Sequence, residues 1–186
     1  MLIIGDFGPT YPGEAKSWID GYSPVLIAAE FHQPAVLRLL LQYGGDPNAK
    51  SRDIEHTALS LAFSRARWLD LGPQMSPFDD RQWDNYFLLL DAGANPSETL
   101  GNGYNVVEMA SLTRPEIALR TLKNFPFDGK LDTITYHTID AVERGFPNAN
   151  VRRELLDFLS EEKGVDVEAA IVAYRSYSPP ADDIFD

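Results

Sequence analysis

Residues 23–50 read SPVLIAAEFHQPAVLRLLLQYGGDPNAK, and this stretch carries the signals of two short helices and a closing loop. Ser23 suits a helix N-cap, and Pro24 fits the first helical position. A leucine-rich second segment runs to Gly44, where glycine can take the left-handed conformation that ends a helix. Pro47 then prevents the helix from continuing. The stretch therefore predicts a helix–turn–helix unit.

The same signals return along the chain. The sequence LLLDAGANPS at 88–97 repeats the pattern of LLLQYGGDPN at 39–48, and a weaker version spans 155–166. Helix starts like that at Ser23 recur at Thr57 and Asn105. Internal repetition at this spacing is typical of solenoids. We expect an irregular segment at 1–20 and four repeats at about 21–50, 51–99, 100–131 and 132–166.

The predicted second helix, 34–43, is apolar on more than one side. Five of the six residues from Val36 to Leu41 are apolar, and Arg38 is the exception. At about 100° per residue they cover more than half of the helix circumference. A helix of this kind needs neighbours on both sides, so we expect it to be sandwiched within a stack.

These motifs resemble the ankyrin repeat. The start at 23–29 is similar to the family's Thr-Pro-Leu-His-Leu-Ala-Ala, and the segments 36–41 and 44–49 are similar to its second helix and closing loop. At the family's histidine position this chain has Leu26, Ser60 and Glu108, so we expect the bracing hydrogen bond to be lost or replaced. The resemblance implies an all-α, ankyrin-like solenoid with short hairpin-like loops and a non-catalytic, protein-binding role.

The second repeat contains an insertion, residues 64–85. Gly72 and Pro73 break a helix, and Ser76-Pro77 is typical of a helix start. We therefore expect both helices of this repeat to be lengthened. The favoured interpretation of Trp68 and Trp83 is packing between these helices. The alternative is a partner-binding knob that includes Arg65 and Arg67.

The last helix is predicted at 167–177. Asp166 suits its N-cap, and the apolar residues Val167, Ala170, Ile171 and Tyr174 form one stripe. Such a helix can cover the exposed end of a stack, as terminal units of solenoids do. The remaining residues, 178–186, form an acidic tail.

Composition limits the classes of function. The 186 residues include 16 Lys and Arg against 28 Asp and Glu, for a net charge of -12. This charge argues against binding to nucleic acid or to an anionic membrane. The chain has no cysteine, which excludes disulfides and a cysteine nucleophile. No apolar run suits a membrane span, and the apolar start is too short for a signal peptide, so we expect a cytoplasmic protein.

Candidate chemistry is sparse. His32, His56 and His137 lack the spacing of a zinc site, so no metal, catalytic residue or cofactor is expected. The segment 101–103, Gly-Asn-Gly, is interpreted as a tight turn rather than a dinucleotide loop. An enzyme or small-ligand protein using the insertion, with Asp79, Asp80 and Arg81 as polar groups, is a less favoured alternative. A mimic of nucleic acid built on the acidic surface is another.

In the ankyrin family, partners bind the concave side formed by hairpin tips and inner helices. The positions here that match this side are Tyr22, Glu30, Phe31, Lys50, Arg52, Asp53, His56, Arg65 and Tyr104. The negative charge favours fast capture of a basic partner. We therefore expect an inhibitor or immunity-type protein that neutralises one cognate protein, such as a toxin. An adaptor or a host-directed effector remains the alternative.

Overall fold

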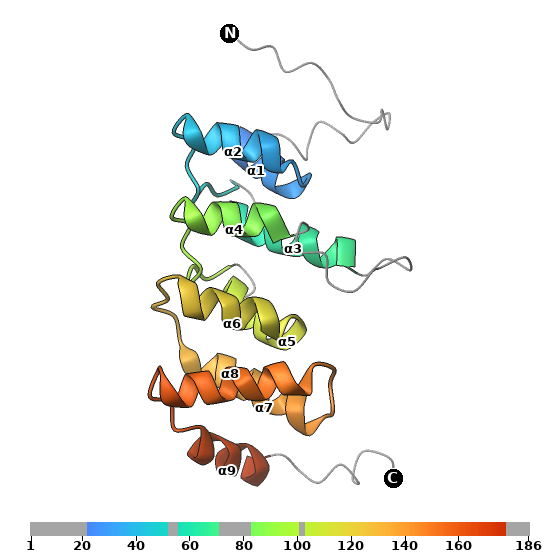
Figure 1. Ribbon diagram of the computed structural model, residues 1–186, viewed down its shortest axis with the longest axis vertical. Helices are drawn as coiled ribbons and strands as arrows, with labels where there is room; N and C mark the ends of the chain where they lie inside the picture. The colour runs from blue at the N-terminus through green and yellow to red at the C-terminus, as the bar shows by residue number, and fades with distance from the viewer. Residues whose placement is uncertain (1–21, 52–55, 71–82, 101–102, 178–186) are drawn as a thin grey trace.

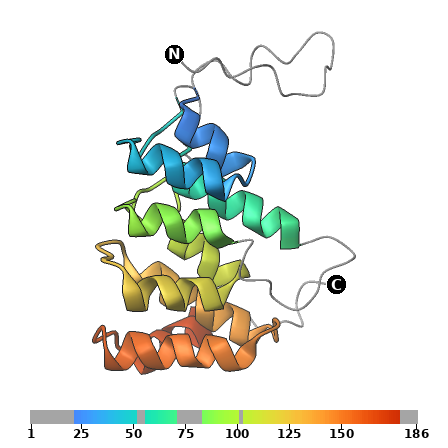
Figure 2. The ribbon, with the colours of Figure 1, turned by 45° about the horizontal axis from the view of Figure 1, so that its top comes forward.

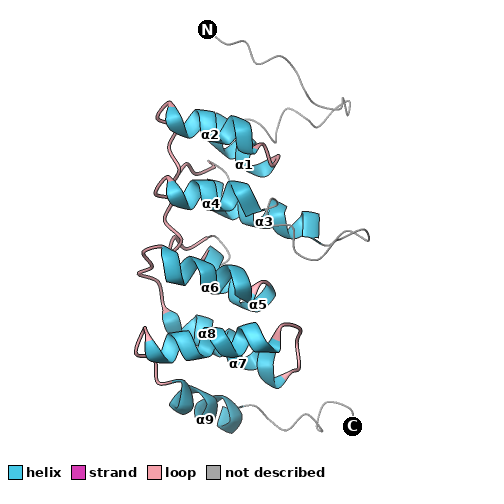
Figure 3. Cartoon of the chain, in the orientation of Figure 1, coloured by secondary structure: helices cyan, strands magenta, loops and turns pink. Residues whose placement is uncertain are grey.

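The computed structural model describes residues 22–51, 56–70, 83–100 and 103–177. Within these ranges the regular structure is helical (Figure 3). Within the described residues an isolated antiparallel bridge joins Lys50 to Thr57. The prediction of an all-α fold is confirmed for the described part of the chain.

The helices stack as pairs in two layers (Figures 1 and 2). The inner row contains α1, α3, α5 and α7, and the outer row contains α2, α4, α6 and α8. The last helix, α9, continues the inner row beyond α7. This arrangement is the predicted solenoid. The helix bounds are Pro24–Glu30 (α1), Pro34–Gln42 (α2), Ala58–Asp70 (α3), Asp84–Asp91 (α4), Val106–Thr113 (α5), Pro115–Asn124 (α6), Leu131–Glu143 (α7), Ala149–Glu161 (α8) and Val167–Tyr177 (α9).

Three inner helices begin with side-chain caps of different construction. Ser23 Oγ accepts a hydrogen bond from the Leu26 backbone N–H at 3.3 Å. At the next start, Ser60 Oγ accepts from the Thr57 N–H at 3.0 Å. At the third, the Glu108 carboxylate accepts from the Asn105 N–H at 2.8 Å. The bracing bond is therefore replaced in two repeats and lost in the first, where Leu26 has no polar side-chain atom.

The helix ends also follow the sequence signals. Gly44 and Gly93 have φ values of 85° and 92°, in the left-handed region that favours glycine. The following loops are then joined across repeats by one side chain. The Asn48 amide donates to the Gly93 carbonyl at 3.1 Å, and Asn48 Oδ1 accepts from the Asn95 N–H at 2.8 Å. The Asp-Pro-Asn turn at 46–48 and the Asn-Pro turn at 95–96 thus bind each other as well as ending their own helices.

The second helix pair contains the largest buried side chains. Trp83, Tyr86 and Phe63 are fully buried, with ring centroids 5.6–6.1 Å apart. The packing interpretation of Trp83 is confirmed, whereas the side chains of Arg67 and Trp68 lie outside the described residues.

Two expectations about the outer helices are wrong. The helix α3 has 13 residues against 7 in α1, as expected, but α4 has only 8 and is not lengthened. The predicted helix start at 76–80 lies outside the described residues. Among the described elements the helix α2 is not sandwiched, because it is the end of the outer row and packs chiefly on α1 and α4. Val36 and Leu39 therefore remain 48% and 54% exposed.

The C-terminal helix α9 packs mainly on α7. Asp166 Oδ1 accepts from the Ala169 N–H at 2.9 Å, which confirms the predicted cap. Val167 and Tyr174 are buried, and Ala170 and Ile171 pack against the core. The predicted apolar stripe is confirmed. The division into repeats stays a prediction, with α7 beginning at Leu131.

Arg152 joins the last two helix pairs. This side chain is only 3% exposed, and its guanidinium donates to the Ser111, Leu112 and Pro147 carbonyls at 2.7, 3.0 and 3.1 Å. The first two carbonyls belong to the last turn of α5, where backbone acceptors lack partners within the helix. Burial lowers the pKa of Arg152, and the nearby Glu116 carboxylate opposes this shift. Arg152 therefore acts as a C-terminal cap supplied by another repeat.

Candidate protein-binding face

The loops that join one helix pair to the next lie on one side of the stack (Figure 3). Three depressions follow one another along these loops, with volumes of about 300, 440 and 950 Å³. The first two share Thr99, and the second ends at Lys130 and Thr133, next to Leu131 and Asp132 of the third. We call the surface that lines these depressions the loop face.

The first depression is bordered by an ion pair. Lys50 Nζ contacts Glu98 Oε1, and both side chains are partly exposed. Lys50 belongs to the predicted partner-binding set, and here it is already bound to a carboxylate of the next loop. A pair this exposed contributes less than about 1 kcal/mol, so a binding partner can displace it.

Three predicted residues occupy equivalent positions beside the loops. Tyr22, His56 and Tyr104 each lie two residues before the first residue of an inner helix. Tyr22 is half-buried, and burial together with the charge of Glu30 raises the pKa of its hydroxyl. Tyr104 is 40% exposed and lines the second depression. The structure thus brings a predicted side chain to the start of each of three successive inner helices.

Other predicted residues lie at the opposite end of the inner helices. Phe31 is the C-cap of α1 and is 58% exposed, and Glu30 is the last residue of that helix. Arg65 follows Phe31 by 34 residues and is exposed on α3 at the corresponding place. At 1.5 Å per residue, α1 separates its two ends by roughly 10 Å. The partner-binding set is therefore divided between the N-terminal and C-terminal ends of the inner helices, and Arg52 and Asp53 lie outside the described residues.

An aromatic row that the sequence did not reveal continues the face toward the C-terminus. Its ring centroids are 5.6 Å apart for Tyr104 and His137, 6.3 Å for His137 and Tyr136, and 5.4 Å for Tyr136 and Tyr174. Tyr136 is 49% exposed. The fourth repeat has no recognisable start motif, so nothing in the sequence aligned Tyr136 with Tyr104. Tyr174 was assigned only to the buried stripe.

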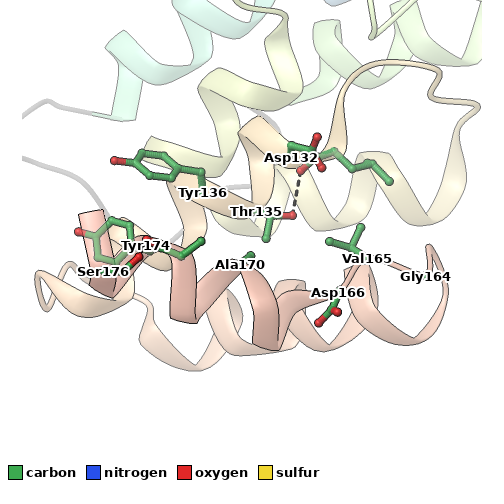
Figure 4. A pocket seen from close by; sticks show the side chains of 11 residues that line it. Asp132, Thr135, Tyr136, Gly164, Val165, Asp166, Ala170, Tyr174 and Ser176 are labelled. Carbon is green, nitrogen blue, oxygen red and sulfur yellow. Dashed lines mark hydrogen bonds between the residues drawn. The ribbon is translucent and has the colours of Figure 1, made fainter. Parts of the chain in front are cut away.

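The third depression is a groove between α7 and α9 (Figure 4). Leu131, Thr135 and Tyr136 line it from α7, and Val165 and Ala170 line it from the loop before α9 and from α9 itself. The groove is mostly apolar, with carboxylates at Asp132 and Asp166.

No metal-binding chemistry is assembled among the residues that the structure describes. Within these ranges no group of three or more His, Cys, Asp or Glu side chains could hold a metal ion. His137 Nδ1 is buried without a hydrogen-bond partner there, but its ring lies in the aromatic row.

Residues 20–52, which include α1 and α2, match the family model of the ankyrin repeat. With the stacked helix pairs, this match makes the fold an all-α, ankyrin-like solenoid. The ankyrin repeat is a protein–protein interaction module, and its family is generally non-catalytic. A search of curated proteins gives no match. None of the described helices is long and apolar enough to cross a membrane.

Proposed function

We propose that this chain is an inhibitor of the immunity type, which binds one cognate basic protein in the cytoplasm, such as a toxin, and neutralises it. The proposal needs neither a cofactor nor a catalytic residue. It rests on one observation: a chain of net charge -12 has carboxylates along its loop face that form no ion pair within the described residues.

Three aspartates carry this observation. Asp128 lines the second depression, and Asp132 and Asp166 line the third. The described basic residues in the lining of the three depressions are Lys130, also in the second depression, and Lys50, which is bound to Glu98. Like charges held close together repel each other in the isolated protein and attract a partner of opposite charge. A basic partner would therefore associate quickly, and salt would weaken its capture.

Exposed aromatic side chains supply the second component of binding. Tyr104 and Tyr136 are partly exposed on the loop face, close to the three aspartates. Tyrosine is enriched among the few residues that dominate the binding energy of protein interfaces. The face thus combines apolar anchors with negative charge, which suits a basic surface that contains apolar patches.

The test is affinity capture from the source lysate with the tagged full chain, at low and at high salt. We expect one stoichiometric basic protein, released by salt, whose own activity stops when the chain is added. Capture of an acidic protein that salt does not release would contradict the proposal, as would a captured protein that stays active.

Paired variants then locate the contact. The variant Tyr104→Ala with Tyr136→Ala should weaken capture by at least about tenfold, as expected for hot-spot residues. Its control is Phe146→Ala, which removes an exposed ring from the loop between α7 and α8, at the opposite end of the helices from the loop face. The variant Tyr22→Ala with Phe31→Ala tests the N-terminal part of the predicted set. Equal loss in the control would place the contact elsewhere.

A further inference from the structure

We propose that the groove between α7 and α9 binds a segment of the partner in which an apolar side chain is flanked by lysine or arginine. This inference rests on the proposed function and names the part of the partner that is recognised. A volume of about 950 Å³ lies within the usual size of ligand sites, roughly 300–1,000 Å³.

Small residues create the groove. Ala170 and Ala173 of α9 face α7 across it, and Val165 and Leu131 lie at its loop end. Because the alanine side chains are short, α9 covers α7 without filling the space between the two helices. Among the described elements α9 is followed by no second helix (Figure 1). The groove therefore remains open to an apolar side chain.

At the end of the groove opposite the loop, the wall formed by Tyr174 and Tyr136 is held in place by contacts within the protein. The Tyr174 hydroxyl donates to Asp140 Oδ1 at 2.7 Å, and Arg144 Nε donates to the same oxygen at 2.7 Å. The Tyr174 ring in turn packs against the Tyr136 ring, 5.4 Å away (Figure 4). A site with fixed walls loses less entropy on binding.

The charge of the groove identifies the occupant. Asp132 and Asp166 are the charged residues in the lining, and neither forms an ion pair within the described residues. One Asp166 oxygen accepts from the Ala169 N–H, which leaves its charge unneutralised. The nearby arginines, Arg144 and Arg175, are already paired with Asp140 and Glu143. A lysine or arginine next to the inserted apolar side chain would satisfy both carboxylates.

The chain's own tail fits this chemistry poorly. Residues 178–186 contain Ile184 and Phe185, which are apolar enough for the groove. They also contain Asp182, Asp183 and Asp186 and no basic residue. Negative charge beside Asp132 and Asp166 would be repelled, so a basic partner segment is the better occupant.

Fluorescein-labelled peptides test the groove by anisotropy with the full chain. The probe is a 12-residue peptide with one central leucine flanked by two lysines, in otherwise Gly/Ser sequence. We expect saturable binding that weakens at least about tenfold when the lysines become glutamates or the leucine becomes serine. Binding that ignores both changes, or no binding at all, would overturn the proposal.

Groove variants locate the binding. Ala173→Lys puts a long cationic side chain on an exposed helix position of the lining and should abolish binding. Asp132→Asn with Asp166→Asn should weaken binding about fivefold and reduce its salt dependence, since asparagine can keep the α9 cap. The matched control, Asp157→Asn with Glu161→Gln, removes two exposed charges from α8 outside the lining and should leave binding unchanged. An unaffected Ala173→Lys variant would contradict the proposal.

The tail variant Ile184→Ser with Phe185→Ser addresses the competing occupant. We expect the peptide affinity to remain unchanged, whereas a clear increase would show that the tail fills the groove and would overturn the inference. If the chain captures and inhibits a basic partner but does not bind the peptide, the groove proposal is wrong and the proposed inhibitor function stands. Peptide binding at the groove with no partner captured from lysate would support the groove and count against the inhibitor function.

Discussion

The first helix pair and the C-terminal half of the stack are built by different means. The pair α1–α2 lies within the match to the ankyrin repeat, yet α2 buries only Leu37 completely and leaves Leu39 about half exposed. The half from α5 to α9 lies outside the matched residues. Its helices nevertheless bury side chains in every layer, including the charged Arg152.

This difference shows that local helix signals and burial between repeats contribute separately to the fold. Repeat motifs determine caps and turns, which involve residues close together in the chain. Burial depends on neighbours from other repeats, and an end unit has neighbours on one side. In a solenoid, stability is the sum of unit and interface contributions. The pair with the clearest motif is therefore expected to be the least stable part of the described stack.

The largest effect is expected from Arg152→Ala. It would leave the Ser111, Leu112 and Pro147 carbonyls without their donor, at a cost of about 4 kcal/mol of unfolding free energy. Urea denaturation measures the change. The exposed neighbour provides the control, since Arg153→Ala should change stability by less than about 0.5 kcal/mol. If Arg152→Ala cost as little unfolding free energy as Arg153→Ala, the cap would contribute nothing to stability.

Two buried leucines, one in each region, allow the stabilities of the two regions to be compared directly. Leu37→Ala in α2 and Leu155→Ala in α8 each remove a fully buried side chain, at about 3 kcal/mol. Leu37→Ala should increase hydrogen exchange in 24–42 only, because the end pair can open alone. Leu155→Ala should lower the denaturation midpoint of the whole C-terminal half. Faster exchange throughout the chain in the Leu37 variant would show that the two regions unfold as one.

A smaller effect is expected between the second helix pair and the C-terminal half. The Tyr86 hydroxyl in α4 lies 3.1 Å from Thr121 Oγ1 in α6, and burial raises the pKa of Tyr86. Tyr86→Phe keeps the ring and loses this bond, which should cost about 1 kcal/mol in urea denaturation. The exposed Tyr43→Phe serves as the control and should have no measurable effect. Unchanged stability of the Tyr86→Phe variant would mean that ring packing alone, without this hydrogen bond, stabilises the contact between α4 and α6.

The smallest effect is expected from the exposed ion pairs, which should not distinguish the two regions. Lys50→Met at Glu98 and Lys123→Met at Glu154 should each cost about 0.5 kcal/mol or less, and less again in high salt. Thermal unfolding at two salt concentrations measures this. A much larger cost for the Lys50 variant would mean that this loop pair holds the first repeats together.

Local features of the fold were predictable, because the residues that make them are neighbours in the chain. The Ser23 cap, the left-handed Gly44 and the Asp166 cap each depend on three or four consecutive residues. The exposure of α2 was not predictable from its composition, because it depends on which helices pack beside it.

The same reason limits prediction of the binding face. Tyr22 and Tyr104 were found because each precedes a helix-start motif. Tyr136 lies within α7, where no such motif marks the register, and its closeness to Tyr174 arises only when α9 stacks on α7. Arg152 likewise caps a helix about 40 residues earlier in the chain, as its hydrogen bonds to Ser111 and Leu112 show.

The most direct measurement is hydrogen exchange of the full chain, free and bound to its captured partner. The account predicts protection in 103–105, 131–137 and 164–176, on the loop face and its groove, with the outer helices α2, α4, α6 and α8 unchanged. Protection confined to the outer helices would contradict the central claim that the partner binds the loop face.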